Sequence, residues 1–167
     1  DTTALKNYSN NLNEKINLLK SQIFNLSKIS FNISSPKQLG EILFEKLKLS
    51  DKPKKTKSGQ YSTNETELLK LKKKHPIIEK VLDYRTLQKL LNTYVDALPS
   101  MINQKDKKIH TSFNNTVTNT GRLSSSSPNL QNIPIRKDSG KDVRRAFVPS
   151  NSDYILMAAD YSQIELR

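Results

Sequence analysis

The 167-residue sequence contains no cysteine and no tryptophan, and it has only two histidines. Without cysteine the chain can form no disulfide, no thiolate zinc site and no thiol nucleophile. His75 and His110 stand far apart with no companion ligand pattern, so we expect surface or packing roles for both. No apolar run approaches the length that spans a bilayer, and no signal-peptide segment opens the chain. The sequence therefore predicts no membrane partner.

Positive charge is what the chain has in excess. Lys and Arg number 28 against 16 Asp and Glu, which gives a formal net charge of +12. Such a balance favours an acidic partner, and a nucleic-acid backbone is the leading candidate. A lysine-rich solvated surface is the competing interpretation, because lysine and asparagine are abundant along the whole chain.

The first part of the chain has the apolar periodicity of helices. Apolar residues recur every three or four positions over 4–28, with lysine and asparagine between them. A second helix is expected to begin at Pro36 with Ser35 as its N-cap. Gly40 weakens that helix slightly, since glycine is a poor helix former.

Two further helices are predicted after residue 63. Thr63 or Asn64 can cap a helix over "ETELLKLKKK", which ends at His75-Pro76 because a residue before proline avoids the helical region. Pro76 then opens a longer helix over 76–97 with its own apolar set.

A basic stretch separates these pairs of helices. Residues 50–63, "SDKPKKTKSGQYST", are rich in lysine, contain proline and glycine, and have almost no apolar residues. This composition predicts a mobile basic loop. A disordered linker and a loop that touches phosphates through lysine, serine and threonine are both compatible with it.

The composition changes after Pro99, where apolar residues come in short groups among asparagine and serine. The segment "KIHTSFNNTV" alternates as a strand does, and "AFVPSNSDYILMAAD" predicts a strand, a turn at 151–153 and a second strand. We therefore expect an α+β fold with a helical part over 1–108 and a mixed part over 109–167.

The segment 118–136, "TNTGRLSSSSPNLQNIPIR", is dense in hydrogen-bonding side chains. A loop needs some of them for its turns. Amides beside a guanidinium also suit the minor groove of a duplex, where every base pair presents acceptors and binding needs no sequence readout.

The chain ends with "ILMAADYSQIELR", in which we expect a buried strand from Tyr154 to Ala159 to deliver Asp160 to its end. A carboxylate beside a turn at a strand end can hold Mg²⁺, although one aspartate cannot build a two-ion site. Capping of a following helix, with Gln163 as the partner of a capping box, is the alternative use of this aspartate.

Several long segments together resemble one family. Three segments, in this order and spacing, are similar to family A DNA polymerases: "TGRLSSSSPNLQNIPIR", "VRRAFVP" and "DYSQIELR". The last of these segments resembles the motif A of that family. The resemblance extends to "FNISSPKQLGEILFEKLKL", "KKTKSGQYST", "HPIIEKVLDYRTLQKLLNTYVDALP" and "IHTSFNNTV", which look like the thumb and the entry into the palm. It implies that 1–108 is a helical thumb with its tip near 50–63, and that 109–167 is the first part of the palm. One departure is Ser127, which stands where the family usually has aspartate.

The resemblance also implies roles for individual residues. Asp160 corresponds to the catalytic aspartate that binds two Mg²⁺ ions, Tyr161 adds its backbone carbonyl, and Glu165 excludes ribonucleotides at the sugar. The residues expected at DNA are Arg122, Asn132 and Gln131 in the minor groove, Arg136, Lys89 and Arg85 on backbone phosphates, and Lys54, Lys55 and Lys57 in the tip loop.

The implied activity is that of a DNA-directed DNA polymerase, which adds dNTPs to a primer 3′-hydroxyl by two-metal-ion phosphoryl transfer. Its partners are primer–template DNA and dNTP, and we expect a monomer in the bacterial cytoplasm, at the nucleoid, or in an organelle. Because the chain starts at Asp1 rather than Met, we expect a fragment, inactive without the second carboxylate. A non-catalytic nucleic-acid-binding module with a degenerate polymerase core and a purely structural helical protein are the alternatives.

Overall fold

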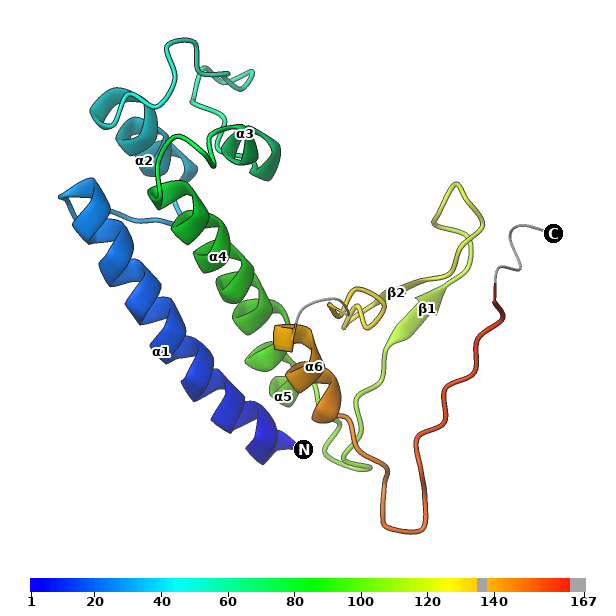
Figure 1. Ribbon diagram of the computed structural model, residues 1–167. Helices are drawn as coiled ribbons and strands as arrows, with labels where there is room; N and C mark the ends of the chain where they lie inside the picture. Colours follow the sequence, from blue (N-terminus) through cyan, green and yellow to red (C-terminus); the bar gives the residue numbers. More distant parts are fainter. Residues whose placement is uncertain (135–137, 163–167) are drawn as a thin grey trace.

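The computed structural model describes residues 1–134 and 138–162. Two long helices run side by side in opposite directions, α1 (Thr2–Ser27) and α4 (Ile77–Leu90) (Figure 1). Shorter helices gather at one end of this pair: α2 (Pro36–Gly40), the π-helix η1 (Glu41–Lys46) and α3 (Glu65–Lys70). The opposite end carries the π-helix η2 (Leu91–Val95), α5 (Ala97–Ser100) and α6 (Asp138–Arg145).

The sheet of the described residues is small. Strand β1 (Ser112–Asn114) pairs antiparallel with β2 (Ser124–Ser126), with Phe113 opposite Ser125. This arrangement confirms the predicted α+β fold. None of the helices among the described residues is long and apolar enough to cross a membrane.

Local sequence accounts for where the helices begin. The Asp1 carboxylate accepts a hydrogen bond from the Ala4 amide at 2.9 Å and caps α1. Ser35 and Asn64 cap α2 and α3 in the same way, by accepting from the amides of Gln38 and Glu67. The Ser35 cap was predicted, and Asn64 was one of two predicted candidates with Thr63, because an N-cap bond joins residues only three positions apart.

The predicted helix over 76–97 is present but not uniform. It is α-helical to Leu90, and then widens into the π-helical turn η2, where the Asp96 amide donates to the Leu91 carbonyl at 2.9 Å. After this turn it continues as α5. Apolar periodicity does not distinguish the two helical geometries, so this change could not be predicted from it.

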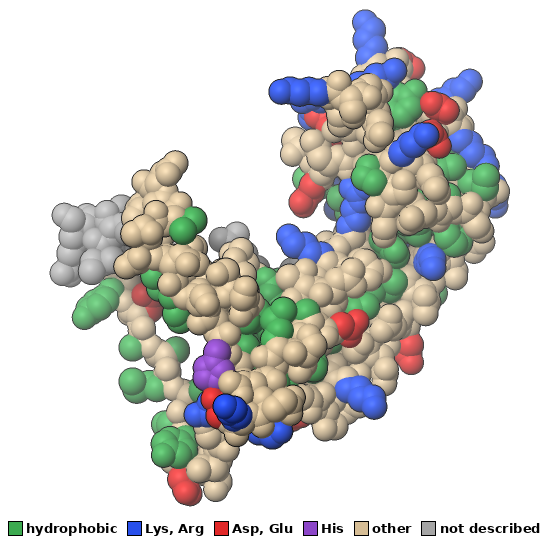
Figure 2. Space-filling view, turned by 180° about the vertical axis from the view of Figure 1, so that it is seen from behind, with side chains coloured by type: hydrophobic (Ala, Val, Ile, Leu, Met, Phe, Trp, Pro, Cys, Tyr) green, Lys and Arg blue, Asp and Glu red, His purple; other side chains and the backbone are tan. Residues whose placement is uncertain are grey.

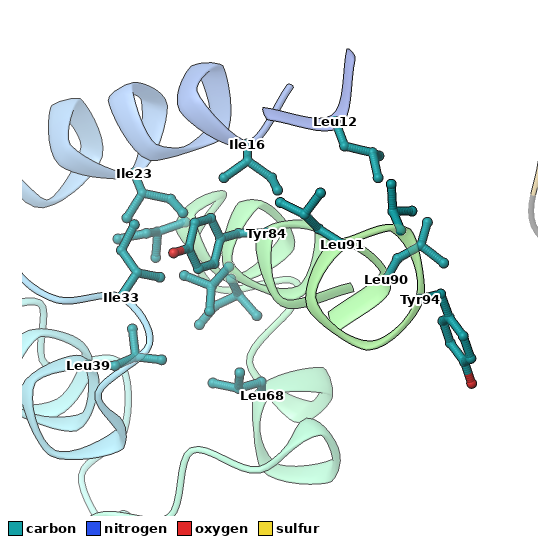
Figure 3. Packing of buried hydrophobic residues seen from close by; sticks show 14 of the residues in the cluster. Leu12, Ile16, Ile23, Ile33, Leu39, Leu68, Tyr84, Leu90, Leu91 and Tyr94 are labelled. Atoms are coloured by element: carbon teal, nitrogen blue, oxygen red, sulfur yellow. The ribbon is translucent and has the colours of Figure 1, made fainter. Parts of the chain in front are cut away.

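The core lies between α1, α4 and the short helices α2 and α3 (Figure 3). Ile16 and Ile23 of α1 face Tyr84 and Leu91 from the α4–η2 helix. Leu39 and Leu68 close the core from α2 and α3, and each is fully buried. Burial of one such side chain contributes about 1.5–3 kcal/mol, so this layer fixes the short helices on the long pair.

The basic segment 50–63 folds into a short hairpin, which we call the tip hairpin. The Ser62 amide donates to the Lys54 carbonyl at 2.8 Å, and the Thr56 amide to the Gln60 carbonyl at 2.8 Å. Gly59 makes the turn with a φ of +78°, a conformation that favours glycine. The basic loop expected from composition is therefore a hydrogen-bonded hairpin with its lysines exposed, and its mobility stays a prediction.

Gly40 is the contact point between α2 and the tip hairpin. A Cβ atom at this position would lie 2.8 Å from the Cβ of Tyr61. The Tyr61 ring lies 5.2 Å from that of Phe44, measured between centroids. The glycine that weakens the helix therefore allows the hairpin to approach it closely.

The strands predicted over 146–160 are absent from the described structure. The turn is present, since the Asp153 amide donates to the Asn151 side chain at 3.0 Å. Residues 154–159 form no strand and are not buried, with Ile155 at 87% and Met157 at 86% exposure. The prediction of a buried strand is wrong here because no described segment supplies the backbone hydrogen bonds that a strand requires.

Candidate nucleic-acid interface

A groove lies between the tip hairpin and α4. It has a volume of about 620 Å³, and we call it the inner groove. Its lining combines apolar surface with amide, hydroxyl and cationic groups, which come from Thr56, Gln60, Thr63, Asn64, Arg85, Gln88, Lys89 and Asn92. Such groups are the donors that contact phosphate and sugar oxygens in protein–DNA complexes.

Arg85 spans the inner groove at one point. Its guanidinium donates to the Thr63 carbonyl, and its second terminal nitrogen donates to the Thr63 hydroxyl at 3.1 Å. The side chain is half-buried, and this burial lowers the pKa of the guanidinium from its usual value. The structure thus gives Arg85 a protein partner. Its predicted contact with a DNA phosphate stays a prediction.

Lys89 lies one helical turn beyond Arg85, exposed at the edge of the inner groove. Lys55 and Lys57 are exposed on the tip hairpin, and the Lys55 ammonium lies 5.3 Å from the centre of the Tyr61 ring. Lys54 differs from them, since it lines a second pocket on the α3 side of the hairpin. The predicted cations of the tip are therefore distributed over both sides of the hairpin.

Arg122 lies in a tight turn before β2. Gly121 makes this turn with a φ of +71°, and the Thr118 hydroxyl donates to the Arg122 carbonyl. The Arg122 side chain extends from an exposed position. The turn needs this glycine because an L side chain rarely adopts such a φ.

Gln131 and Asn132 are also exposed, on a loop that internal hydrogen bonds hold in place. The buried Ser125 hydroxyl accepts from the Leu130 amide at 3.0 Å, and the Asn129 side chain accepts from the Gln131 amide at 3.1 Å. Some polar side chains of the segment 118–136 therefore stabilise its turns, which was the alternative interpretation of this segment. Arg136 lies outside the described residues.

Asp160 and Tyr161 lie in the exposed extended segment after the turn at 151–153. The described residues contain no group of three or more His, Cys, Asp or Glu that could hold a metal ion. Asp160 supplies one hard oxygen ligand, which fits Mg²⁺ in type but not in number. Glu165 and the predicted partner Gln163 lie outside the described residues.

Among the groove residues that the sequence did not single out as DNA contacts are Gln60, Gln88 and Asn92. A signal for two of them exists, because Arg85, Gln88 and Asn92 are spaced three and four residues apart and share one helix face. Gln60 has no such signal, since only the hairpin brings it to α4.

Comparison with known proteins identifies the family. Residues 2–167 match the family model described as DNA polymerase family A, and the chain belongs to this family. It is 54% identical over 168 residues to the DNA polymerase I of Synechocystis sp., covering all of this chain and 17% of that protein. The DNA polymerase I of Bacillus subtilis is 49% identical over 167 residues, again covering the whole chain and 19% of the relative. The chain therefore spans about a fifth of the length of these curated relatives.

A solved structure shares the fold. It is the POL domain of Pol1 from M. smegmatis in complex with DNA primer–template and dNTP. The TM-score is 0.79 at 39% identity, over 89% of this chain and 26% of that one. The resemblance found in the sequence motifs is thereby confirmed.

Proposed function

We propose that this chain is the thumb and first palm segment of a DNA-directed DNA polymerase that extends a primer 3′-hydroxyl with dNTPs. The inner groove carries this proposal, because a family A chain presents cations, amides and hydroxyls there, in a form suited to a duplex of any sequence. Residues 1–108 form the thumb, and residues 109–167 form the palm segment. The protein acts as a monomer in the bacterial cytoplasm, at the nucleoid, or in an organelle.

The thumb grips the duplex through charge. Lys89 with Lys54, Lys55 and Lys57 neutralises backbone phosphates, and each neutralised phosphate releases counterions. Arg122, Gln131 and Asn132 donate to minor-groove acceptors, and Arg136 holds a phosphate near the primer end. The exposure of the first three side chains supports this assignment.

The palm segment contributes one part of the catalytic centre. Asp160, with the Tyr161 carbonyl, is proposed as a ligand of two Mg²⁺ ions whose remaining ligands come from other parts of the polymerase. When bound, these ions supply Lewis-acid stabilisation of the reacting phosphate. Asp160 lies on an exposed segment, so its carboxylate is accessible to such a partner surface. Glu165 excludes the ribose 2′-hydroxyl.

The test compares variants of the full-length protein. Asp160→Asn is expected to abolish templated dNTP incorporation while leaving primer–template affinity within about twofold, because the charge removed is not a DNA contact. Lys89→Gln is expected to weaken DNA binding and to reduce its salt dependence. The 167-residue chain alone is expected to bind duplex DNA and to incorporate no dNTP. Duplex binding without dNTP incorporation by the wild-type protein would favour the non-catalytic module instead, and unchanged incorporation by Asp160→Asn would refute the proposed role of Asp160.

A further inference from the structure

A second pocket lies on the other side of the tip hairpin, against α3. It has a volume of about 320 Å³, and we call it the outer lysine pocket. Phe44 and Leu71 contribute apolar surface, and Ser50 and Ser62 contribute hydroxyl groups. Four lysines line it: Lys52, Lys54, Lys70 and Lys74.

The charge of this pocket is unbalanced. Glu67 is the one carboxylate in its lining, and it accepts from the Lys70 ammonium at 2.8 Å. This hydrogen bond lowers the pKa of Glu67, so the carboxylate is ionised at neutral pH. Four ammonium groups against one carboxylate leave an excess of three positive charges. Like charges gathered in a pocket repel one another, and an anion between them offsets this cost.

One backbone contact and one ion pair hold part of the lysine set in place. The Lys74 ammonium donates to the Leu49 carbonyl at 3.1 Å, which fixes its side chain against the pocket wall. Lys70 is fixed by Glu67 on the neighbouring turn of α3. Two of the four cations are therefore positioned before any ligand binds, which reduces the entropy that binding costs.

The outer lysine pocket is separate from the inner groove. The two share only Ser62 among their lining residues. The exposed Lys55 and Lys57 on the tip hairpin continue the positive charge beyond the pocket. Figure 2 shows lysine and arginine side chains gathering over this end of the molecule.

We propose that the outer lysine pocket binds backbone phosphates of a DNA strand outside the inner groove, so that the tip hairpin is held by nucleic acid on both sides. The inference rests on the proposed function, because it takes DNA as the partner of the inner groove. Lysine is a compact charge with rotatable donors and no demand for planar geometry, which suits phosphates of any sequence. A strand is favoured over a free anion because the lysines continue from the pocket along the hairpin.

The test measures duplex affinity of the 167-residue chain against salt concentration. The variant K52Q/K70Q/K74Q is compared with K6Q/K15Q/K20Q, which removes three exposed charges from α1 instead. If the pocket binds phosphates, the slope of log affinity against log salt falls by about 2–3 in the first variant and stays unchanged in the second. Equal slopes in wild type and K52Q/K70Q/K74Q would refute the proposal.

Three further measurements separate the possible causes. K70R/K74R keeps the charge and is expected to keep the slope. If the triple variant folds poorly, K52E reverses the charge at a single exposed position and is expected to lower the slope. Inorganic pyrophosphate is titrated as the free-anion probe. Loss of pyrophosphate binding with an unchanged duplex slope would overturn the strand assignment. If the salt slope falls in Lys89→Gln but not in K52Q/K70Q/K74Q, only this inference is refuted. If duplex binding by the wild-type chain does not depend on salt, the proposed function is refuted.

Discussion

Arg85 on α4 and Thr63 at the foot of the tip hairpin are joined by two hydrogen bonds, although they lie 22 residues apart. Thr63 is buried and immediately precedes Asn64, the N-cap of α3. The pair therefore fixes the hairpin and the start of α3 on the long helix in one contact. Both residues of this contact also line the inner groove.

Replacing Arg85 with methionine is expected to destabilise the chain by about 1–3 kcal/mol, because the buried Thr63 carbonyl then loses its donor. Urea unfolding followed by circular dichroism measures the change. Lys89→Met removes the same charge from an exposed position one turn away, and it is expected to cost less than about 0.5 kcal/mol. Equal losses in the two variants would show that Arg85 has no structural role beyond its charge.

Two physical effects predict opposite changes in stability for Gly40→Ala. Helix propensity alone predicts stabilisation by about 1 kcal/mol. The structure predicts destabilisation by about 1–3 kcal/mol, because the new methyl group would lie 2.8 Å from the Tyr61 Cβ and force the hairpin away. Thermal unfolding decides between them. Lys37→Ala, at an exposed position of α2, is the control and is expected to change stability little.

The Lys70–Glu67 pair predicts that the stability of the fold depends on pH in the acidic range. The Lys70 hydrogen bond lowers the pKa of Glu67 below its ordinary value of 4.5. A depressed folded-state pKa means that the stabilisation is present above 4.5 and is lost as pH falls through the folded value. Lys70→Gln is therefore expected to raise the pKa of Glu67, as followed by NMR titration of its side-chain carboxyl.

Lys73→Gln is the matched control for that titration. It removes an equal charge from an exposed neighbour that no hydrogen bond joins to Glu67 in the described structure. We expect the pKa of Glu67 to change less in this variant than in Lys70→Gln. Equal shifts would mean that general charge, not the hydrogen bond, lowers the pKa.

The sequence by itself determined the positions of the main helices before residue 97, the Ser35 cap and the family. Ser35, Asn64 and the apolar periodicity act between residues three or four positions apart, so they can be read without a tertiary structure. The family follows from motifs such as "DYSQIELR", whose residue order is itself the evidence.

Tertiary structure alone decided which side chains meet. The Arg85–Thr63 bonds, the approach of Tyr61 to Gly40 and the pairing of β1 with β2 each join residues separated by intervening elements. The exposure of residues 154–159 belongs with them, since an apolar run becomes a buried strand only when a neighbour supplies hydrogen bonds and a covering face. The composition of a segment indicates which secondary structure it can form. Which partner then supplies its hydrogen bonds and covers its apolar face is decided by the folded chain.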